Sequence, residues 1–226
     1  MNIEAKTLVE TLEQIAADFG LDASELVRYA DADKIGGYHT DADLSTYPIG
    51  SIWGVEGQIL YALVCATQPK QILELGAFMG CSRAHMEAAT YVNKVGEITS
   101  VDLKHDADVM GDGVEYLRKS RKKWDFIFED MLHRMDETRD AWKYGIAKLR
   151  HGGFIVSHDA LHHIVGVDVR AGIEANGIQP KYYLTKPSDC GLAIWRKPQE
   201  PKKPARKRAK KTEVKTKVKP FNVEEK

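Results

Sequence analysis

The sequence predicts an α/β fold, in which helices cover both faces of a mostly parallel, seven-stranded sheet that ends in an antiparallel hairpin. From residue 52 to residue 198, strand-like runs alternate with helical runs, which is typical of a parallel sheet whose strands are joined by helices. The last two strand-like runs, 181–186 and 191–197, are separated by the turn "PSDC". That turn is too short for a crossover helix, so these two strands are expected to be antiparallel.

The elements can be placed in order along the chain. Apolar residues recur at helical spacing from Leu8 to Phe19, and Gly20 ends this predicted helix. A short helix follows at 22–30, and residues 31–50 have no sustained period, which indicates a long ordered loop or lid. The other predicted elements are helices at 53–68, 80–92, 112–123, 136–150 and 166–177, and strands at 71–75, 96–103, 124–130, 153–159, 181–186 and 191–197.

Charge is distributed unevenly over the 226 residues, although Lys and Arg together equal Asp and Glu at 33 each. Residues 199–226 hold 11 basic against 4 acidic side chains, a net charge of +7, which leaves −7 on residues 1–198. The last segment is rich in Lys and Pro with few large apolar residues, so we expect it to be disordered. The chain thus divides into an N-terminal helical and lid segment (1–51), a ligand-binding domain (52–198) and a basic tail (199–226).

Composition also suggests the compartment. The N-terminus lacks the basic start and apolar core of a signal peptide, and no apolar run has the roughly 20 residues of a membrane span. The cysteines Cys65, Cys81 and Cys190 form neither a disulfide framework nor a thiolate zinc motif. We therefore expect a cytoplasmic protein.

The stretch "QILELGAFMGCSR" (71–83) is the main functional motif. Gly76 and Gly80 frame a loop between a strand and a helix, where the backbone can approach a ligand and free N–H groups can hold an anion. Glu74 before this glycine loop (76–80) would repel a pyrophosphate but could help to hold an ammonium group. Asp102, at the end of the next strand, is placed to accept hydrogen bonds from ribose hydroxyls. A ligand with an amino-acid end and a ribose fits these constraints, and S-adenosylmethionine is such a ligand.

The loop has two other interpretations. A dinucleotide site is disfavoured because the loop reads Gly-Ala-Phe-Met-Gly-Cys and lacks the Gly-x-Gly-x-x-Gly fingerprint. The loop could also be a strand-to-helix turn that binds nothing.

Several motifs, found in order between residues 54 and 197, resemble those of class I S-adenosylmethionine-dependent methyltransferases, in the small-molecule O-methyltransferase branch that includes catechol and caffeoyl-CoA enzymes and the group called methyltransferase type 24. They are "VEGQILYAL", which is similar to the helix that leads into the first motif, followed by "ILELGAFMGCS", "GDGVEYL", "WDFIFEDMLH" and "LRHGGFIVSHDAL". The resemblance implies a Rossmann-like methyltransferase fold, and dimers are common among such relatives. The cofactor-binding residues that we expect are Glu74, Gly76, Ala77, Phe78, Gly80, Ser82, Asp102, Asp112, Gly113 and Asp130.

The chain departs from this family between Asp102 and Gly111, where only "LKHDADVM" intervenes. The family places a helix and most of a strand there, and a parallel crossover needs about a dozen residues. We therefore expect the second helix to be missing and the third strand to be very short. This leaves the adenine pocket, and the role of Asp112 beside it, open.

Acidic and histidine residues follow two predicted strands, in "EDMLH" (129–133) and "SHDALHH" (157–163). By the family resemblance, Asp130, His158 and Asp159 are candidate ligands of a divalent cation, and an oxygen-rich set favours Mg²⁺ or Mn²⁺. His133 stands where relatives carry a base, so His133 and Asp130 are the predicted catalytic residues. A base and a cation suit methyl transfer to a hydroxyl, which is a weak nucleophile near neutral pH.

The same residues could instead have structural roles. A strand-end Asp can cap the following helix, and His162 and His163 can be ordinary surface residues. Aromatic residues of the predicted lid could cover an acceptor pocket or simply belong to the core; they are Tyr38, His39, Tyr47 and Trp53.

The leading hypothesis is O-methylation of a hydroxyl on a small-molecule or sugar-like acceptor, using S-adenosylmethionine and Mg²⁺ or Mn²⁺. One alternative is methylation of a nucleic acid or protein that the basic tail holds by its charge. Base-amine methyltransferases usually show Asn/Asp-Pro-Pro-aromatic after the fourth strand, whereas this chain has "EDML". Another alternative is a non-catalytic S-adenosylmethionine-binding protein that the tail tethers to a polyanion.

Overall fold

The structure is a computed structural model that describes residues 3–30, 52, 54–185 and 190–200. The strands are β1 (Gln71–Leu75), β2 (Glu97–Asp102), β3 (Val109–Met110), β4 (Trp124–Glu129), β5 (Leu149–Ser157), β6 (Lys181–Tyr183) and β7 (Leu192–Arg196). The helices are α1 (Leu8–Phe19), α2 (Ala23–Ala30), α3 (Gly54–Thr67), α4 (Cys81–Asn93), α5 (Gly113–Lys119), α6 (Met135–Lys148) and α7 (Gly166–Glu174).

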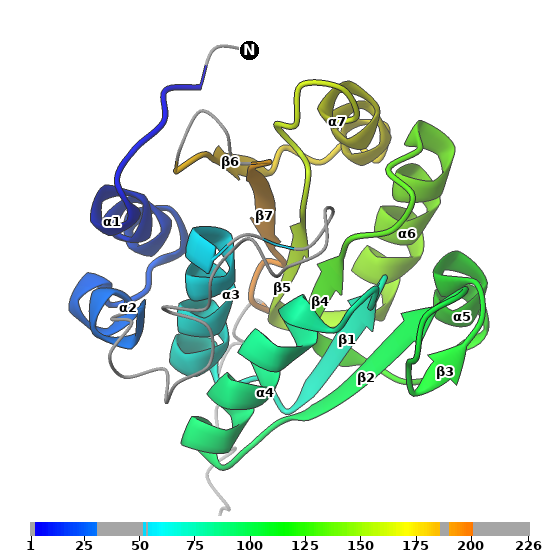
Figure 1. Ribbon diagram of the computed structural model, residues 1–226, viewed down its shortest axis with the longest axis horizontal. Coiled ribbons are helices and arrows are strands. Elements are labelled where there is room, and N and C mark those ends of the chain that lie inside the picture. Colours follow the sequence, from blue (N-terminus) through cyan, green and yellow to red (C-terminus); the bar gives the residue numbers. More distant parts are fainter. Residues whose placement is uncertain (1–2, 31–51, 53, 186–189, 201–226) are drawn as a thin grey trace, which may run out of the picture.

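The strands form a seven-stranded sheet in the order β3-β2-β1-β4-β5-β7-β6 (Figure 1). The five strands from β3 to β5 pair in parallel, and β7 is antiparallel to both β5 and β6. The predicted fold class, including the antiparallel end of the sheet, is therefore confirmed.

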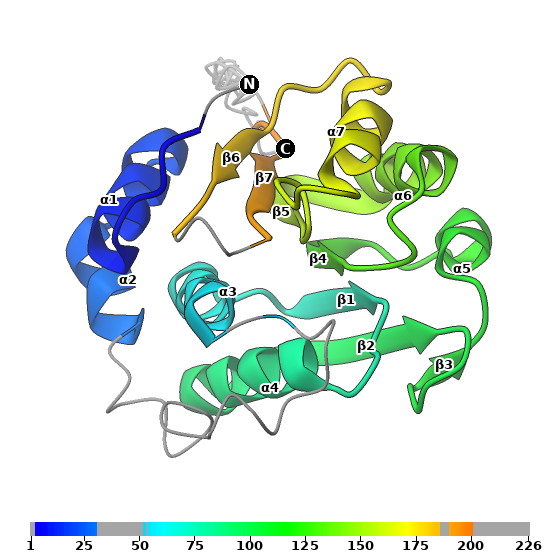
Figure 2. The same ribbon diagram turned by 45° about the horizontal axis from the view of Figure 1, so that its top comes forward.

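Helices cover both faces of the sheet, with α1 to α4 on one side and α5 to α7 on the other (Figures 1 and 2). Successive strand residues point to opposite faces, so each strand supplies both cores. Ile72 and Phe126 join the core beneath α1 to α4, whereas Leu73 and Ile127 join the core beneath α5 to α7. The central strands are thus buried on both faces, as a parallel sheet requires.

The segment between β2 and β3 agrees with the prediction. Within the described chain, residues 103–108 contain no helix, and β3 has only two residues. The short connection still permits parallel pairing because the Asp102 side chain accepts hydrogen bonds from the Lys104 and His105 N–H groups, which turns the chain back. The Gly111 N–H then donates to the Asp102 carbonyl at 2.8 Å and closes the turn.

The start of β5 differs from the prediction. The sequence predicts a helix to residue 150 and a strand from 153, but α6 ends at Lys148 and β5 begins at Leu149. The β4–β5 register shifts between Trp124 and Phe126, so the first part of β5 forms an irregular pairing. A side chain at Gly153 would lie 2.6 Å from the Asp125 carbonyl oxygen, so this close approach requires glycine.

Backbone hydrogen bonds join the strand ends at the carboxyl edge of the sheet. The Gly76 N–H donates to the Val101 carbonyl at 2.9 Å, and the Asp130 N–H donates to the Leu75 carbonyl at 2.8 Å. The His158 N–H donates to the Glu129 carbonyl at 3.0 Å. The residues that follow β1, β4 and β5 are therefore held side by side, at the edge where open α/β sheets bind ligands.

Some predictions fall on residues that the structure leaves out. The predicted lid with its aromatic residues (Tyr38, His39, Tyr47 and Trp53) and most of the basic tail (201–226) lie outside the described residues. Among the helices that are described, none has the length and hydropathy needed to cross a membrane.

Candidate active site

The glycine loop follows β1 at the carboxyl edge of the sheet. Gly76 has φ of +87°, and a side chain there would overlap the carbonyl group of Asp130. Gly80 has φ of +80° and precedes α4, but a side chain there would meet open space. Gly76 is therefore required by close packing, and Gly80 only by its backbone conformation.

Asp102, at the end of β2, holds the glycine loop through its side chain. One carboxylate oxygen accepts the N–H groups of Ala77 and Phe78 at 2.9 and 3.0 Å, and the other accepts those of Lys104 and His105. Burial opposes ionisation, but these four hydrogen bonds outweigh it and lower the pKa of Asp102. Asp102 is thus an ionised group that positions the loop.

A cleft of about 280 Å³ opens beside the glycine loop. Five of the predicted cofactor-binding residues line it: Gly76, Phe78, Asp102, Gly113 and Asp130. The predicted base His133 lines it as well, together with Leu103, Met131 and Leu132. The cleft therefore brings the ends of β1, β2 and β4 together with the start of α5.

The other predicted cofactor-binding residues lie around this cleft. Ala77 and Ser82 line a small adjoining hollow that also touches Gly76 and Asp130. Asp112 accepts a hydrogen bond from the Glu115 N–H as the N-cap of α5, and it lines a separate surface depression. The cap role considered for strand-end carboxylates is thus seen at Asp112.

Glu74 is fully buried beneath the glycine loop. Its carboxyl group accepts hydrogen bonds from the hydroxyls of Ser82, at 2.6 Å, and Ser100. Burial raises the pKa of Glu74 to about 7, despite these two hydrogen bonds. Glu74 therefore links Ser82 in α4 to Ser100 in β2 beneath the glycine loop. Its carboxyl group is only partly ionised near neutral pH.

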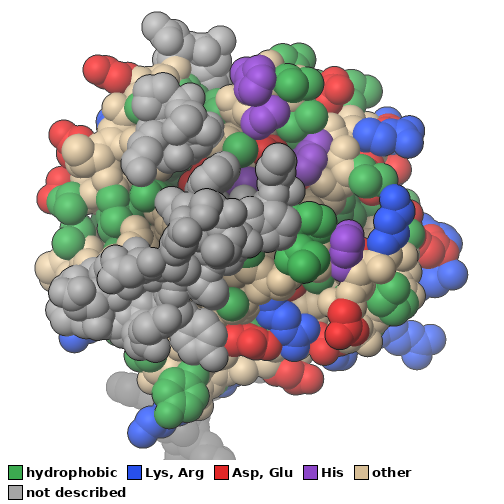
Figure 3. Space-filling model, viewed as in Figure 1, with side chains coloured by type: hydrophobic (Ala, Val, Ile, Leu, Met, Phe, Trp, Pro, Cys, Tyr) green, Lys and Arg blue, Asp and Glu red, His purple; other side chains and the backbone are tan. Residues whose placement is uncertain are grey.

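Asp130, His133, His158 and Asp159 meet at the ends of β4 and β5, and we call these four residues the acidic–histidine cluster. The Nε2 atom of His133 lies 3.0 Å from Asp130 Oδ1 and 2.9 Å from Asp159 Oδ2. The Nδ1 atom of His158 lies 3.1 Å from Asp159 Oδ2 and 3.4 Å from Asp130 Oδ1. In the space-filling view, histidine side chains gather on this face of the molecule (Figure 3). The structure therefore brings all the predicted catalytic and metal residues together.

Charge pairing controls protonation in the cluster. Burial alone would lower the pKa of His133, but hydrogen bonds to Asp130 and Asp159 raise it to about 10. His158 is more deeply buried, yet the same two carboxylates raise its pKa well above the usual value. Conversely, the two histidines outweigh burial and lower the pKa values of Asp130 and Asp159. Both imidazole rings are therefore in the protonated, positively charged form at neutral pH in this arrangement.

His133 and Asp159 also have left-handed backbone conformations, with φ of 58° and 56°. Asp and His adopt this region more readily than most non-glycine residues, but it is still disfavoured. The packing around the cluster holds both residues there, which directs their side chains toward each other.

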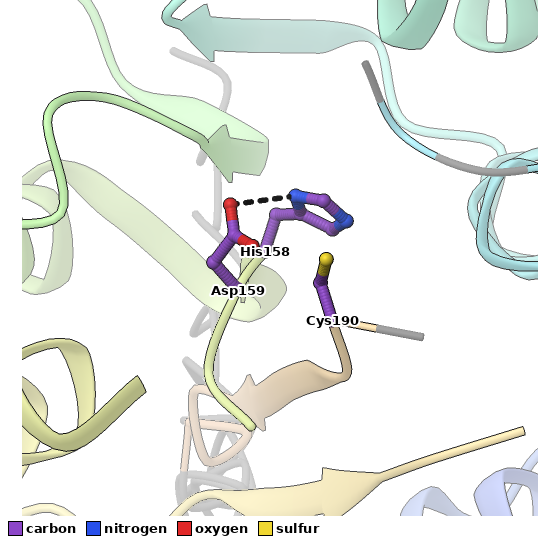
Figure 4. Close-up of side chains that lie close together, drawn as sticks. All are labelled: His158, Asp159 and Cys190. Carbon is purple, nitrogen blue, oxygen red and sulfur yellow. Dashed lines mark hydrogen bonds and ion pairs between the residues drawn. The ribbon is translucent and has the colours of Figure 1, made fainter. Parts of the chain in front are cut away.

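Two further residues reach the cluster from distant parts of the chain. Glu56 in α3 is buried and accepts a hydrogen bond from His158 Nε2 at 3.0 Å. Cys190, just before β7, lies close to His158 and Asp159 (Figure 4). Neither was predicted as a site residue: Glu56 lies in "VEGQILYAL", which was matched only as the helix that leads into the glycine loop, and Cys190 is far from any motif. The one available signal was a Glu inside the apolar run "WGVEGQILYALVCATQ".

The cluster offers donor atoms that fit a divalent cation. In the described residues, two groups have ligand atoms within 4.8 Å of one another: Asp130, His133 and Asp159, and His158, Asp159 and Cys190. The predicted ligands Asp130, His158 and Asp159 are divided between these groups, which share Asp159. Two carboxylates with an imidazole are a suitable set for a divalent metal ion.

Comparisons with known proteins agree with this architecture. Solved structures similar to this one include the SAH-bound methyltransferase PaMTH1 of Podospora anserina. It matches at TM-score 0.53 and 16% identity, over 87% of this chain and 99% of that one. The cofactor-bound protein Rv0187 from MTB matches at TM-score 0.55 and 16% identity, over 77% of this chain and 90% of the other. The O-methyltransferase TomG of Streptomyces achromogenes, in complex with SAM, matches at TM-score 0.50 and 18% identity, over 75% and 87%.

These identities establish the fold alone, and no curated protein matches the sequence. The family is shown separately, by a sequence model described as O-methyltransferase that matches residues 39–155, more than half of the chain. The chain therefore belongs to the O-methyltransferase family and is a methyltransferase with the Rossmann-like fold.

Proposed function

We propose that this protein transfers the methyl group of S-adenosylmethionine to a hydroxyl of a small-molecule or sugar-like acceptor, with assistance from a divalent cation. The observation that carries the proposal is that one cleft is lined both by the glycine loop with Asp102 and by Asp130 with His133. A cofactor held by the glycine loop and Asp102 would present its methyl group beside the acidic–histidine cluster.

The cofactor is assigned by the chemistry of the lining. Asp102 keeps an ionised carboxylate on the cleft wall, which suits ribose hydroxyls. The glycine loop precedes the N-terminus of α4, where free N–H groups suit a carboxylate. Apolar contacts for the adenine would come from Leu103 and Met131. SAH and SAM occupy the similar structures of PaMTH1 and TomG, which supports the same assignment here.

Methyl transfer from a sulfonium is an in-line displacement, in which the acceptor oxygen attacks the methyl carbon as the carbon–sulfur bond breaks. In the proposed reaction His133 takes the proton of the acceptor hydroxyl, and its hydrogen bonds to Asp130 and Asp159 keep the ring in place. When bound to Asp130 and Asp159, a cation such as Mg²⁺ or Mn²⁺ supplies positive charge that lowers the pKa of the hydroxyl.

The state of His133 is a reason to expect a cation. The ring donates its Nε2 proton to the carboxylates of Asp130 and Asp159, and these hydrogen bonds raise the pKa of His133 to about 10 against the opposing effect of burial. A base must give up its own proton before it can accept another. The proposal therefore requires the charge of Asp130 and Asp159 to be offset in the working enzyme.

The test starts with calorimetry of the full chain with SAH, followed by methyl transfer to a panel of hydroxylated small molecules. We expect SAH binding, transfer that needs Mg²⁺ or Mn²⁺, and loss of transfer in EDTA. His133→Gln should abolish transfer and leave SAH affinity within about threefold, because His133 contacts Asp130 and Asp159 and not the glycine loop or Asp102. SAH binding without transfer to any acceptor would instead favour a non-catalytic binding protein, and no SAH binding would contradict the proposal.

We also propose that the basic tail (199–226) binds a polyanion, as a second function of the protein beside methyl transfer. A broad groove at the opposite edge of the sheet, of about 1160 Å³, supports this role. Its basic lining residues are Lys70, Arg121, Lys122, Lys123 and Arg150, against the acidic Glu97 and Asp125. Gln199, the first residue of the tail, also lines the groove, so the tail begins beside this basic surface. A chain truncated after Glu200 should lose most salt-dependent binding to a homopolymer RNA. Unchanged binding would contradict this role.

A further inference from the structure

Cys190 lies beside the acidic–histidine cluster and adds a thiol ligand that a magnesium site does not need. His158, Asp159 and Cys190 present a nitrogen, an oxygen and a sulfur atom within 4.8 Å of one another (Figure 4). Thiol ligands select zinc, iron and similar ions, whereas Mg²⁺ prefers oxygen atoms. Three protein ligands with a position left for substrate are the usual composition of a catalytic zinc site.

Glu56 completes the pattern of such a site. Its Oε2 lies 3.0 Å from His158 Nε2, so this carboxylate fixes the proton on Nε2. The other ring nitrogen, Nδ1, faces Asp159, 3.1 Å away. Histidines that bind metals commonly donate their second N–H to a carboxylate, which orients the ring and raises its basicity. Glu56 and His158 are almost completely buried, so this orientation is rigid.

The backbone holds Cys190 in place as well. The Leu161 N–H donates to the Cys190 carbonyl at 2.8 Å, and the Gly191 N–H donates to Glu56 Oε1 at 2.6 Å. Gly191 has φ of 74°, and a side chain there would lie 2.6 Å from Leu161 Cβ. The segment before β7 is thus packed directly against the turn that carries Asp159. The position of the thiol beside His158 is therefore built into the fold.

We propose that His158, Asp159 and Cys190 bind a thiophilic transition-metal ion such as Zn²⁺, with Glu56 as the carboxylate that positions His158. This inference rests on the proposed function, because it concerns the cation of the same site, and it replaces the expected Mg²⁺ by a softer ion. A divalent ion bound there would deprotonate the Cys190 thiol, since coordinating thiols are held as thiolates.

Cobalt spectroscopy tests the proposal, because Co²⁺ bound to a thiolate gives a near-ultraviolet charge-transfer band that oxygen and nitrogen ligands do not give. The full chain without a histidine tag, stripped of metal by a chelator, is titrated with Co²⁺. We expect the band in the wild type, its displacement by equimolar Zn²⁺, and no displacement by excess Mg²⁺. The band should be lost in Cys190→Ala and kept in Cys65→Ala, a matched control in the core.

Glu56→Gln should keep the band at saturation but weaken Co²⁺ binding by about 10- to 100-fold, as expected for a carboxylate that orients a ligand. Cobalt binding without the band, a band that survives in Cys190→Ala, or no cobalt binding would overturn the inference. SAH calorimetry on the same samples reports whether each variant is folded. If the wild type binds SAH and shows Mg²⁺-dependent transfer but gives no band, only this inference fails. If the wild type does not bind SAH, the proposed function fails.

Discussion

At the carboxyl edge of the sheet, the glycine loop is held by hydrogen bonds from backbone N–H groups to Asp102, whereas the acidic–histidine cluster is held by charged side chains from separate segments. The loop follows β1, and Asp102 ends β2, which is the neighbouring strand in the sheet and the next strand along the chain. The cluster needs Glu56 from α3 and approaches Cys190 before β7. The loop therefore depends on backbone geometry and the cluster on charge balance, so different substitutions should break them.

Gly76→Ala should have the largest effect, because the new methyl group would overlap the Asp130 carbonyl and φ of +87° is strained for alanine. We expect SAH affinity to fall by at least about 100-fold and unfolding free energy to fall by about 3 kcal/mol or more. Calorimetry and urea unfolding measure these changes.

Gly80→Ala is the matched control, because its methyl group would meet open space and only the left-handed φ of +80° is strained. It should cost about 1 kcal/mol. Equal losses in the two variants would show that close packing at Gly76 is unimportant.

His158→Ala should be the next most damaging change, and it tests charge balance in the cluster. His158 contacts Glu56, Asp130 and Asp159, so its removal takes this counter-charge from the buried Glu56 and leaves Asp130 and Asp159 paired with His133. Breaking a buried pair typically costs about 3–5 kcal/mol of stability. Urea unfolding of the chelator-treated protein measures it. The exposed His163, on the same turn, should tolerate alanine within about 0.5 kcal/mol. A mild effect at His158 would contradict the charge-balance account.

Asp102→Asn should separate positioning of the loop from stability alone. Asp102 accepts four backbone N–H groups beside the cleft, and Asp125 accepts the N–H groups of Lys70 and Gln71 at the opposite edge. Asp125→Asn is the matched control. Weakening these charged hydrogen bonds should lower the free energy of unfolding by about 1–2 kcal/mol in both Asp102→Asn and Asp125→Asn. SAH affinity should fall about tenfold or more only in Asp102→Asn. Equal SAH affinities by calorimetry would remove Asp102 from the cofactor site.

The same contrast explains what could be predicted from the sequence. Strand-helix alternation predicted the sheet, and the short "LKHDADVM" predicted the reduced β3, because both depend on residues close in the chain. The glycine loop and the strand-end residues of the cluster were predicted for the same reason. Glu56 and Cys190 were missed because tertiary packing alone brings them to His158. The early start of β5 was missed because its pairing with β4 overrides the helical pattern of residues 149 and 150.

The last prediction concerns the pH dependence that Glu74 contributes, because its carboxyl group lies buried beneath the glycine loop. Burial raises its pKa from 4.5 to about 7, so the folded protein binds a proton more tightly than the unfolded chain does. The resulting stability is complete below about pH 4.5 and is lost as pH rises through 7. Relative to Glu74→Gln, the wild type should therefore lose about 1–3 kcal/mol between pH 5 and pH 8.

Urea unfolding of both proteins across this pH range measures the difference, which cancels the titration of His133 and His158 because both proteins contain them. Glu97→Gln is the control, because Glu97 is an exposed carboxyl group at the start of β2, far from the glycine loop. A pH-independent difference for Glu74→Gln would mean that Glu74 stays ionised beneath the loop. In that case its charge would be available to a cofactor ammonium group, and the backbone-based description of the loop would need a charged partner after all.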